Sequence, residues 1–249
     1  MASRDSSPPP EKSYALPHQP QENFAPAQPE TGREVDRLSV DIPCLDARRI
    51  PFTLVSTSGF HCEVWRSAGS IVSESERVEL DFVLKRHLRP CTYRQAKVLQ
   101  REYTTLRCAL GEMIPQSTFL FTDVNGEENV VALCETCAPW FDLANPGNED
   151  EALHLLSRAP RALADLSRFT ETARVWYERE DRLVDLFGKE NLVIDRSHRV
   201  RYIDSFHVFL YTDVLHTLAE IDPELELRRN IGVNRLEYLE RMVQAVGVR

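Results

Sequence analysis

The stretch DLFGKENLVIDRSHRVRYIDSF, residues 185–206, constrains the fold of this chain most strongly. Two short apolar runs, Asn191–Asp195 and Val200–Asp204, flank a polar turn, and this pattern predicts a β-hairpin. Acids and an amide stand at one end of the hairpin: Asp185, Asn191 and Asp204. Their oxygens suit a hard cation that also carries phosphate oxygens. The alternative is an ordinary surface hairpin whose Asp and Asn side chains only form turns.

Length and charge limit the classes of protein that need considering. The chain has 249 residues, enough for one large domain or two small lobes, and a net charge of −9. The acidic balance argues against a dominant nucleic-acid role, because phosphate neutralisation needs a basic face. No apolar run is long enough to span a bilayer, and no secretion signal opens the sequence. We therefore expect a cytoplasmic protein without a membrane span; the oligomeric state stays open.

Six cysteines are scattered through predicted strands and helices, which favours reduced thiols over a disulfide framework. Cys134 and Cys137 form a lone CxxC. A zinc site would need a second ligand pair, and a redox motif would need a strand leading into a helix. Two small residues flanking a turn are the favoured interpretation.

The first part of the chain divides into a tail and a sheet-forming region. Residues 1–34 are rich in Pro, Ser and Gln, and we expect them to be disordered. Residues 35–137 contain five predicted strands: Phe52–Ser56, Cys62–Arg66, Glu79–Lys85, Ser117–Thr122 and Asn129–Glu135. Polar loop character is predicted for Ser67–Arg77. The turn around Gly59 could let backbone N–H groups approach a phosphate, although an ordinary hairpin turn is the simpler interpretation.

One helix is predicted between the third and fourth strands. Apolar residues recur at steps of three and four over Tyr93–Leu110, and Gly111 ends the pattern. Glu102 lies at the edge of the apolar stripe, where a carboxylate needs a partner. Lys85 is the nearest candidate in sequence; pairing with Lys97 or Arg101, or exposure to solvent, is the alternative.

The second part of the chain, residues 138–249, is mainly helical in this interpretation. A loop is predicted over Pro139–Asp150, and then helical structure over Glu151–Glu180 that is broken or bent near Pro160. The hairpin follows, and then a short helix at Tyr211–Glu220 and a final helix from Pro223 to Gln244.

This order of elements resembles the protein-kinase-like fold, including its smaller bacterial relatives such as aminoglycoside-phosphotransferase-like enzymes. The resemblance covers about residues 50 to 220. It implies a two-lobed α+β fold, with an N-terminal five-stranded antiparallel sheet plus one helix and a small, mainly helical C-terminal lobe. It also implies an enzyme that uses ATP and Mg²⁺ to phosphorylate a hydroxyl of a protein or small molecule.

The resemblance implies roles for particular residues. Lys85 would hold the phosphates and pair with Glu102, and Gly59 would lie in the phosphate loop. Asp185 would accept the proton of the acceptor hydroxyl, while Asn191 and Asp204 would bind metal. Glu135 and Cys137 lie in the connection between lobes, whose backbone would hold adenine.

The sequence also departs from the family pattern. Leu183-Val184 precedes Asp185 where the family has His-Arg or His-Gly, and the step from Asp185 to Asn191 is six residues instead of five. Asp181 is therefore a second candidate for the base. These departures keep two alternatives open: a pseudokinase-like interaction module without turnover, and a regulatory domain unrelated to kinases.

Overall fold

The computed structural model describes residues 52–56, 61–72, 77–212 and 222–247, together with Ile42, Leu45 and Ile50. The predicted tail at 1–34 and the turn that holds Gly59 lie outside the described residues, as does most of the predicted helix at 211–220.

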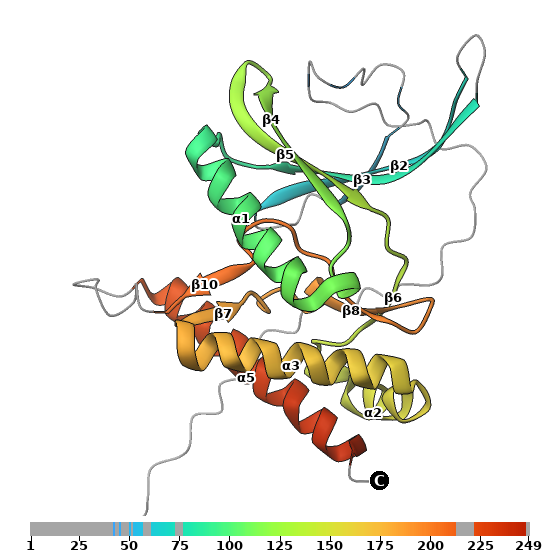
Figure 1. The fold of residues 1–249 in the computed structure, drawn as a ribbon, viewed down its shortest axis with the longest axis vertical. Helices are drawn as coiled ribbons and strands as arrows, with labels where there is room; N and C mark the ends of the chain where they lie inside the picture. The colour runs from blue at the N-terminus through green and yellow to red at the C-terminus, as the bar shows by residue number, and fades with distance from the viewer. Residues whose placement is uncertain are drawn as a thin grey trace, which may run out of the picture. The chain divides into compact units, whose positions relative to one another are not determined.

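A five-stranded antiparallel sheet contains the five strands predicted from the sequence, in the order β1-β2-β3-β5-β4 (Figure 1). The strands are β1 Thr53–Ser56, β2 Cys62–Val72, β3 Arg77–His87, β4 Ser117–Val124 and β5 Glu127–Glu135. The prediction of a loop at Ser67–Arg77 is wrong over most of its length, because β2 continues to Val72 and β3 begins at Arg77. Pairing between β2 and β3 runs without a shift from Cys62 opposite His87 to Val72 opposite Arg77. Ladder hydrogen bonds form whatever the side chains are, so a polar run can continue a strand.

Helix α1, Tyr93–Leu110, has the bounds predicted from its periodicity. Thr92 and Gln95 form a capping box at its start, and Gly111, with a φ of 64°, follows its last residue. Its buried face includes Leu99 and Leu106. The helix contacts β4 and β5, so it lies on the sheet (Figure 1).

The rest of the described chain is mainly helical, with short strands between the helices. Its elements are β6 Pro139–Asp142, α2 Glu149–Arg158, α3 Pro160–Glu180, β7 Arg182–Val184, β8 Leu192–Asp195, β9 Val200–Tyr202, β10 Phe209–Tyr211 and α5 Pro223–Gly247. Three 3-10 turns join them or follow α1: η1 Gly111–Met113, η2 Pro146–Asn148 and η3 Lys189–Asn191. Figure 1 shows α3 and α5 side by side, as their contacts require.

The hairpin predicted around the polar turn is confirmed as β8 and β9, with Leu192 opposite Tyr202. One other prediction for this region is corrected. The predicted loop Pro139–Asp150 holds strand β6, which pairs with β8 and so completes a three-stranded sheet. The break or bend predicted near Pro160 is confirmed as a break, because Ala159 is not helical and Pro160 begins α3.

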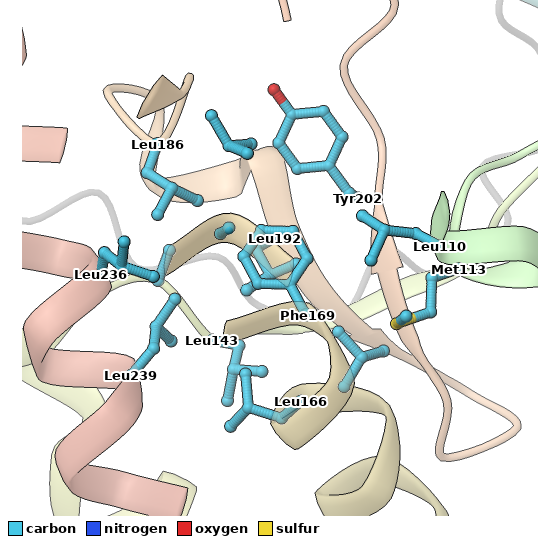
Figure 2. Packing of buried hydrophobic residues seen from close by; sticks show 14 of the residues in the cluster. Leu110, Met113, Leu143, Leu166, Phe169, Leu186, Leu192, Tyr202, Leu236 and Leu239 are labelled. Atoms are coloured by element: carbon cyan, nitrogen blue, oxygen red, sulfur yellow. The ribbon is translucent and has the colours of Figure 1, made fainter. Parts of the chain in front are cut away.

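The largest apolar core lies among these helices and short strands. Figure 2 shows side chains that converge in it: Leu166 and Phe169 of α3, Leu192 of β8, and Leu236 and Leu239 of α5. Two smaller clusters lie at the five-stranded sheet. The fold is therefore α+β, with four α-helices in the described ranges. None of the described helices has the length and apolar character needed to cross a membrane.

Candidate functional site

One cavity of about 520 Å³ gathers most of the predicted site residues. The following of them line it: Lys85, Glu135, Cys137, Asp185, Asn191 and Asp204. They come from β3, from the end of β5 and the segment after it, from the stretch between β7 and β8, and from the segment after β9. Glu102 does not line the cavity, and Gly59 is outside the described residues.

Lys85 links the five-stranded sheet to the hairpin. It lies on β3 between Val64 of β2 and Ala132 of β5, and its ammonium group donates a hydrogen bond to the carbonyl of Ile203. Burial alone would lower the Lys85 pKa, but the electrostatic effect of the neighbouring Cys134 and Asp204 outweighs it and the pKa is raised. The lysine therefore stays a cation, and it is bound to the carbonyl of Ile203, the residue next to Asp204 in the sequence.

Glu102 has a different partner from the one expected. Its carboxyl is 9% exposed and interacts with the hydroxyl of Tyr211, at the end of β10. Burial raises its pKa, against the opposing hydrogen bond from Tyr211. Lys85 and Glu102 are both described, and no ion pair joins them. The ammonium is instead bound to the Ile203 carbonyl, and the carboxyl to the Tyr211 hydroxyl.

Asp185 follows β7, a three-residue strand that pairs with β10. Its Oδ1 accepts a hydrogen bond from the Phe187 backbone N–H at 2.9 Å, and its Oδ2 lies 3.3 Å from Nη2 of Arg228. Burial raises the Asp185 pKa, and the neighbouring Asp204 adds to the effect. The structure thus fixes both carboxyl oxygens at the wall of the cavity.

Asn191 lies between Asp185 and Asp204 and contacts both. Its Nδ2 donates to the backbone carbonyl of Asp185 at 3.1 Å and lies 3.4 Å from Oδ2 of Asp204. The loop with the six-residue step closes through η3 and Gly188, where an added Cβ would lie 2.4 Å from Oδ1 of Asn191. The longer loop therefore still brings Asp185, Asn191 and Asp204 together, and a side chain at position 188 would displace the Asn191 amide.

The chemistry of this donor set fits one hard cation. Asp204 supplies a carboxylate whose Oδ1 accepts a hydrogen bond from the Ser205 backbone N–H at 2.7 Å. Asn191 supplies an amide oxygen when its side-chain amide is flipped, so that Oδ1 takes the place of the Nδ2 that now faces Asp204. Among the described residues, no three His, Cys, Asp or Glu side chains converge as a metal-binding group. Proteins usually hold Mg²⁺ with one or two carboxylates while substrate phosphates and water fill its other positions.

Phe206 anchors the segment after Asp204 to the sheet. It is fully buried with Leu99 of α1 and Ala132 of β5, and its ring lies edge-on to His87 with centroids 5.5 Å apart. His207 then contacts His87, with 3.0 Å between their Nε2 atoms. The position of Asp204 is therefore set by the sheet as well as by the hairpin.

The CxxC segment connects β5 to β6 and contains free thiols. Burial raises the pKa of Cys137 to about 11, so this thiol is protonated at neutral pH. Cys134 is buried near the end of β5, and Cys137 is half-buried in the segment that leads to β6.

Two residues of the cavity were missed from the sequence, Arg228 on α5 and His61 at the start of β2. Arg228 Nη2 lies 3.2 Å from His61 Nε2, and burial lowers the His61 pKa to about 3. The sequence held one indication for Arg228: Arg228, Gly232 and Arg235 are spaced so that they share one face of a predicted helix.

A scan against protein-family models and a search of curated proteins each found no match. The geometry of the site therefore carries the functional argument alone.

Proposed function

We propose that this protein is a two-lobed, protein-kinase-like phosphotransferase that moves the γ-phosphate of ATP to a hydroxyl of a protein or small molecule with the help of Mg²⁺. One observation carries the proposal: a single cavity is lined by Lys85, Asp185, Asn191 and Asp204. Phosphoryl transfer requires positioning and charge neutralisation more than covalent chemistry, and these four groups suit both.

Each residue has a role in this proposal. Lys85 would bind phosphate oxygens of the nucleotide, and the carboxylate of Asp204 with the amide of Asn191 would hold Mg²⁺, which would supply charge neutralisation for the transferring group. Asp185 orients the acceptor hydroxyl and takes its proton. The backbone between Glu135 and Cys137, which lines the same cavity, receives the adenine ring.

The test is phosphate transfer from γ-labelled ATP, measured as label on the protein and as free phosphate. We expect Asp204→Ala to lower transfer by about 10²-fold or more, because the metal loses its carboxylate. Asp123→Ala, an exposed carboxylate at the end of β4, is the matched control and should equal the wild type. Equal transfer by the wild type and Asp204→Ala would exclude the proposal.

A binding module without turnover is the second candidate. The favouring observation is that internal partners engage the polar groups: Lys85 with the Ile203 carbonyl, Glu102 with Tyr211, and Asp185 with Arg228. This candidate predicts that the wild type releases no more phosphate than Asp204→Ala. Measurable, metal-dependent release by the wild type alone would exclude it.

A further inference from the structure

Arg228 brings a cation from the last described helix to the wall of the cavity. Its Nη2 lies 3.3 Å from Asp185 Oδ2 and 3.2 Å from His61 Nε2, and its guanidinium carbon lies 5.1 Å from the centre of the Phe187 ring. The side chain is 15% exposed. Contacts to the loop after β7 and to His61, next to β2, together fix the position of this charge.

The packing of helix α5 against β7 and the loop after it positions the Arg228 side chain at the cavity. Gly232 lies against Leu183 of β7, and an added Cβ would lie 2.8 Å from Leu183 Cδ2. Arg235, one turn further, donates to the carbonyls of Leu186 and Phe187. Arg228, Gly232 and Arg235 are four and three residues apart, so they share the helix face that lies on β7 and the Asp185 loop.

The other cations at the cavity lie elsewhere. Within the described residues, Arg66 and Lys85 also line it; Arg66 pairs with Asp81 at 3.2 Å, and Lys85 reaches the Ile203 carbonyl. Arg228 is the cation that contacts Asp185, where the acceptor oxygen would lie. In phosphoryl transfer, negative charge spreads over the three equatorial oxygens next to that acceptor, and an arginine there stabilises it.

We propose that Arg228 is a catalytic residue that binds the phosphoryl group during transfer. The inference rests on the proposed function. The acceptor oxygen forms a bond to the γ-phosphorus while the bond from that phosphorus to the β–γ bridging oxygen breaks, leaving its electron pair on ADP. The acceptor proton passes to Asp185. Arg228 exchanges Asp185 Oδ2 for an equatorial phosphoryl oxygen and remains a cation throughout.

The test is phosphate release from MgATP with water as the acceptor, so no natural acceptor is needed. We expect Arg228→Ala to lower kcat by about 10²-fold or more, with the KM for ATP changed by less than about threefold. Added guanidinium ion should restore part of the kcat, because the alanine leaves room for it. Arg228→Lys should recover little, since an ammonium lacks the planar fork of an arginine. Arg229→Ala, the next residue along α5, is the matched control and should keep the wild-type rate.

The outcomes separate this inference from the function on which it rests. Metal-dependent release by the wild type, together with an unchanged or higher kcat for Arg228→Ala, would overturn the role of Arg228 and leave the phosphotransferase standing. A loss confined to KM would overturn it in the same way. Absence of binding and release in the wild type would overturn the phosphotransferase itself and the inference with it.

Discussion

The Glu102 carboxyl is a buried acid whose neighbours include a phenol. Burial favours its protonated form and raises its pKa above the ordinary value near 4.5, while the Tyr211 hydroxyl, Arg182 and Arg101 oppose the shift. The folded protein therefore holds this proton more tightly than the unfolded chain does. The free energy of unfolding contributed by Glu102 is then greatest at low pH and falls as the pH rises above that value.

Glu102→Gln should remove this pH dependence, because an amide keeps a hydrogen bond to Tyr211 without titrating. We expect the free energy of unfolding of the wild type, relative to the variant, to fall between about pH 4 and pH 7. Denaturant titrations of both proteins at the two pH values measure it. The KM for ATP should change by less than about twofold, because Glu102 contacts neither Lys85 nor the cavity. A tenfold higher KM for ATP, which corresponds to about 1.4 kcal/mol of binding free energy, would indicate that Glu102 has a direct role in nucleotide binding.

The contacts of some site residues could be predicted from the sequence alone, and those of others could not. Asn191 and Asp204 could be predicted to meet, because both flank one hairpin whose register follows from its short turn. The partner of Glu102 could not, because Tyr211 reaches it only through the pairing of β10 with β7. Arg228 is on a helix beyond the region of family resemblance, and only tertiary packing places it at Asp185.

Helix α5 supports the Asp185 loop through a close approach to β7. Its backbone comes near because Gly232 has no side chain, so Leu183 packs where a Cβ would stand. Leu183 is 2% exposed and lies two residues before Asp185. The depth at which α5 docks is therefore coupled to the position of the proposed base.

Gly232→Val should destabilise the protein by about 1–3 kcal/mol, because the buried Leu183 has little room to move. It should also lower phosphate release beyond the loss of folded protein, since Arg228 and Arg235 move with the helix. Gly247→Ala on the same helix, where nothing lies within 4 Å of an added Cβ, should change stability by less than about 0.5 kcal/mol. Equal stability of the two variants, measured by urea denaturation, would contradict this account of the helix.

Long periodic elements were predictable, and short ones were not. Helix α1 has the predicted bounds because five apolar residues repeat through five turns between a capping box and a glycine. Strands β6 and β7, of four and three residues, give too short a pattern, and β6 begins at a proline in a segment typical of loops. Each of them exists because a partner strand pairs with it.

At the scale of the whole molecule, the site depends on contacts between the sheet and the helical part of the chain. Lys85 of β3 reaches the Ile203 carbonyl, Phe206 is buried against α1 and β5, and Arg228 of α5 reaches His61. These contacts surround one cavity with cationic, carboxylate and amide groups. A bound nucleotide would touch several of them at once, so it should stabilise the folded state as a whole.

The thermal stability of the protein with ATP tests the central claim most directly. Ligand at a hundred times its dissociation constant stabilises by about 2.7 kcal/mol, which raises the melting temperature by roughly 5–10 °C for a chain of this size. We predict this rise for the wild type with ATP and Mg²⁺ together, a much smaller rise without Mg²⁺, and its loss in Lys85→Met and Asp204→Ala, while Asp123→Ala keeps it. A wild-type melting temperature that ATP and Mg²⁺ leave unchanged, or a rise that survives in Asp204→Ala, would contradict the account.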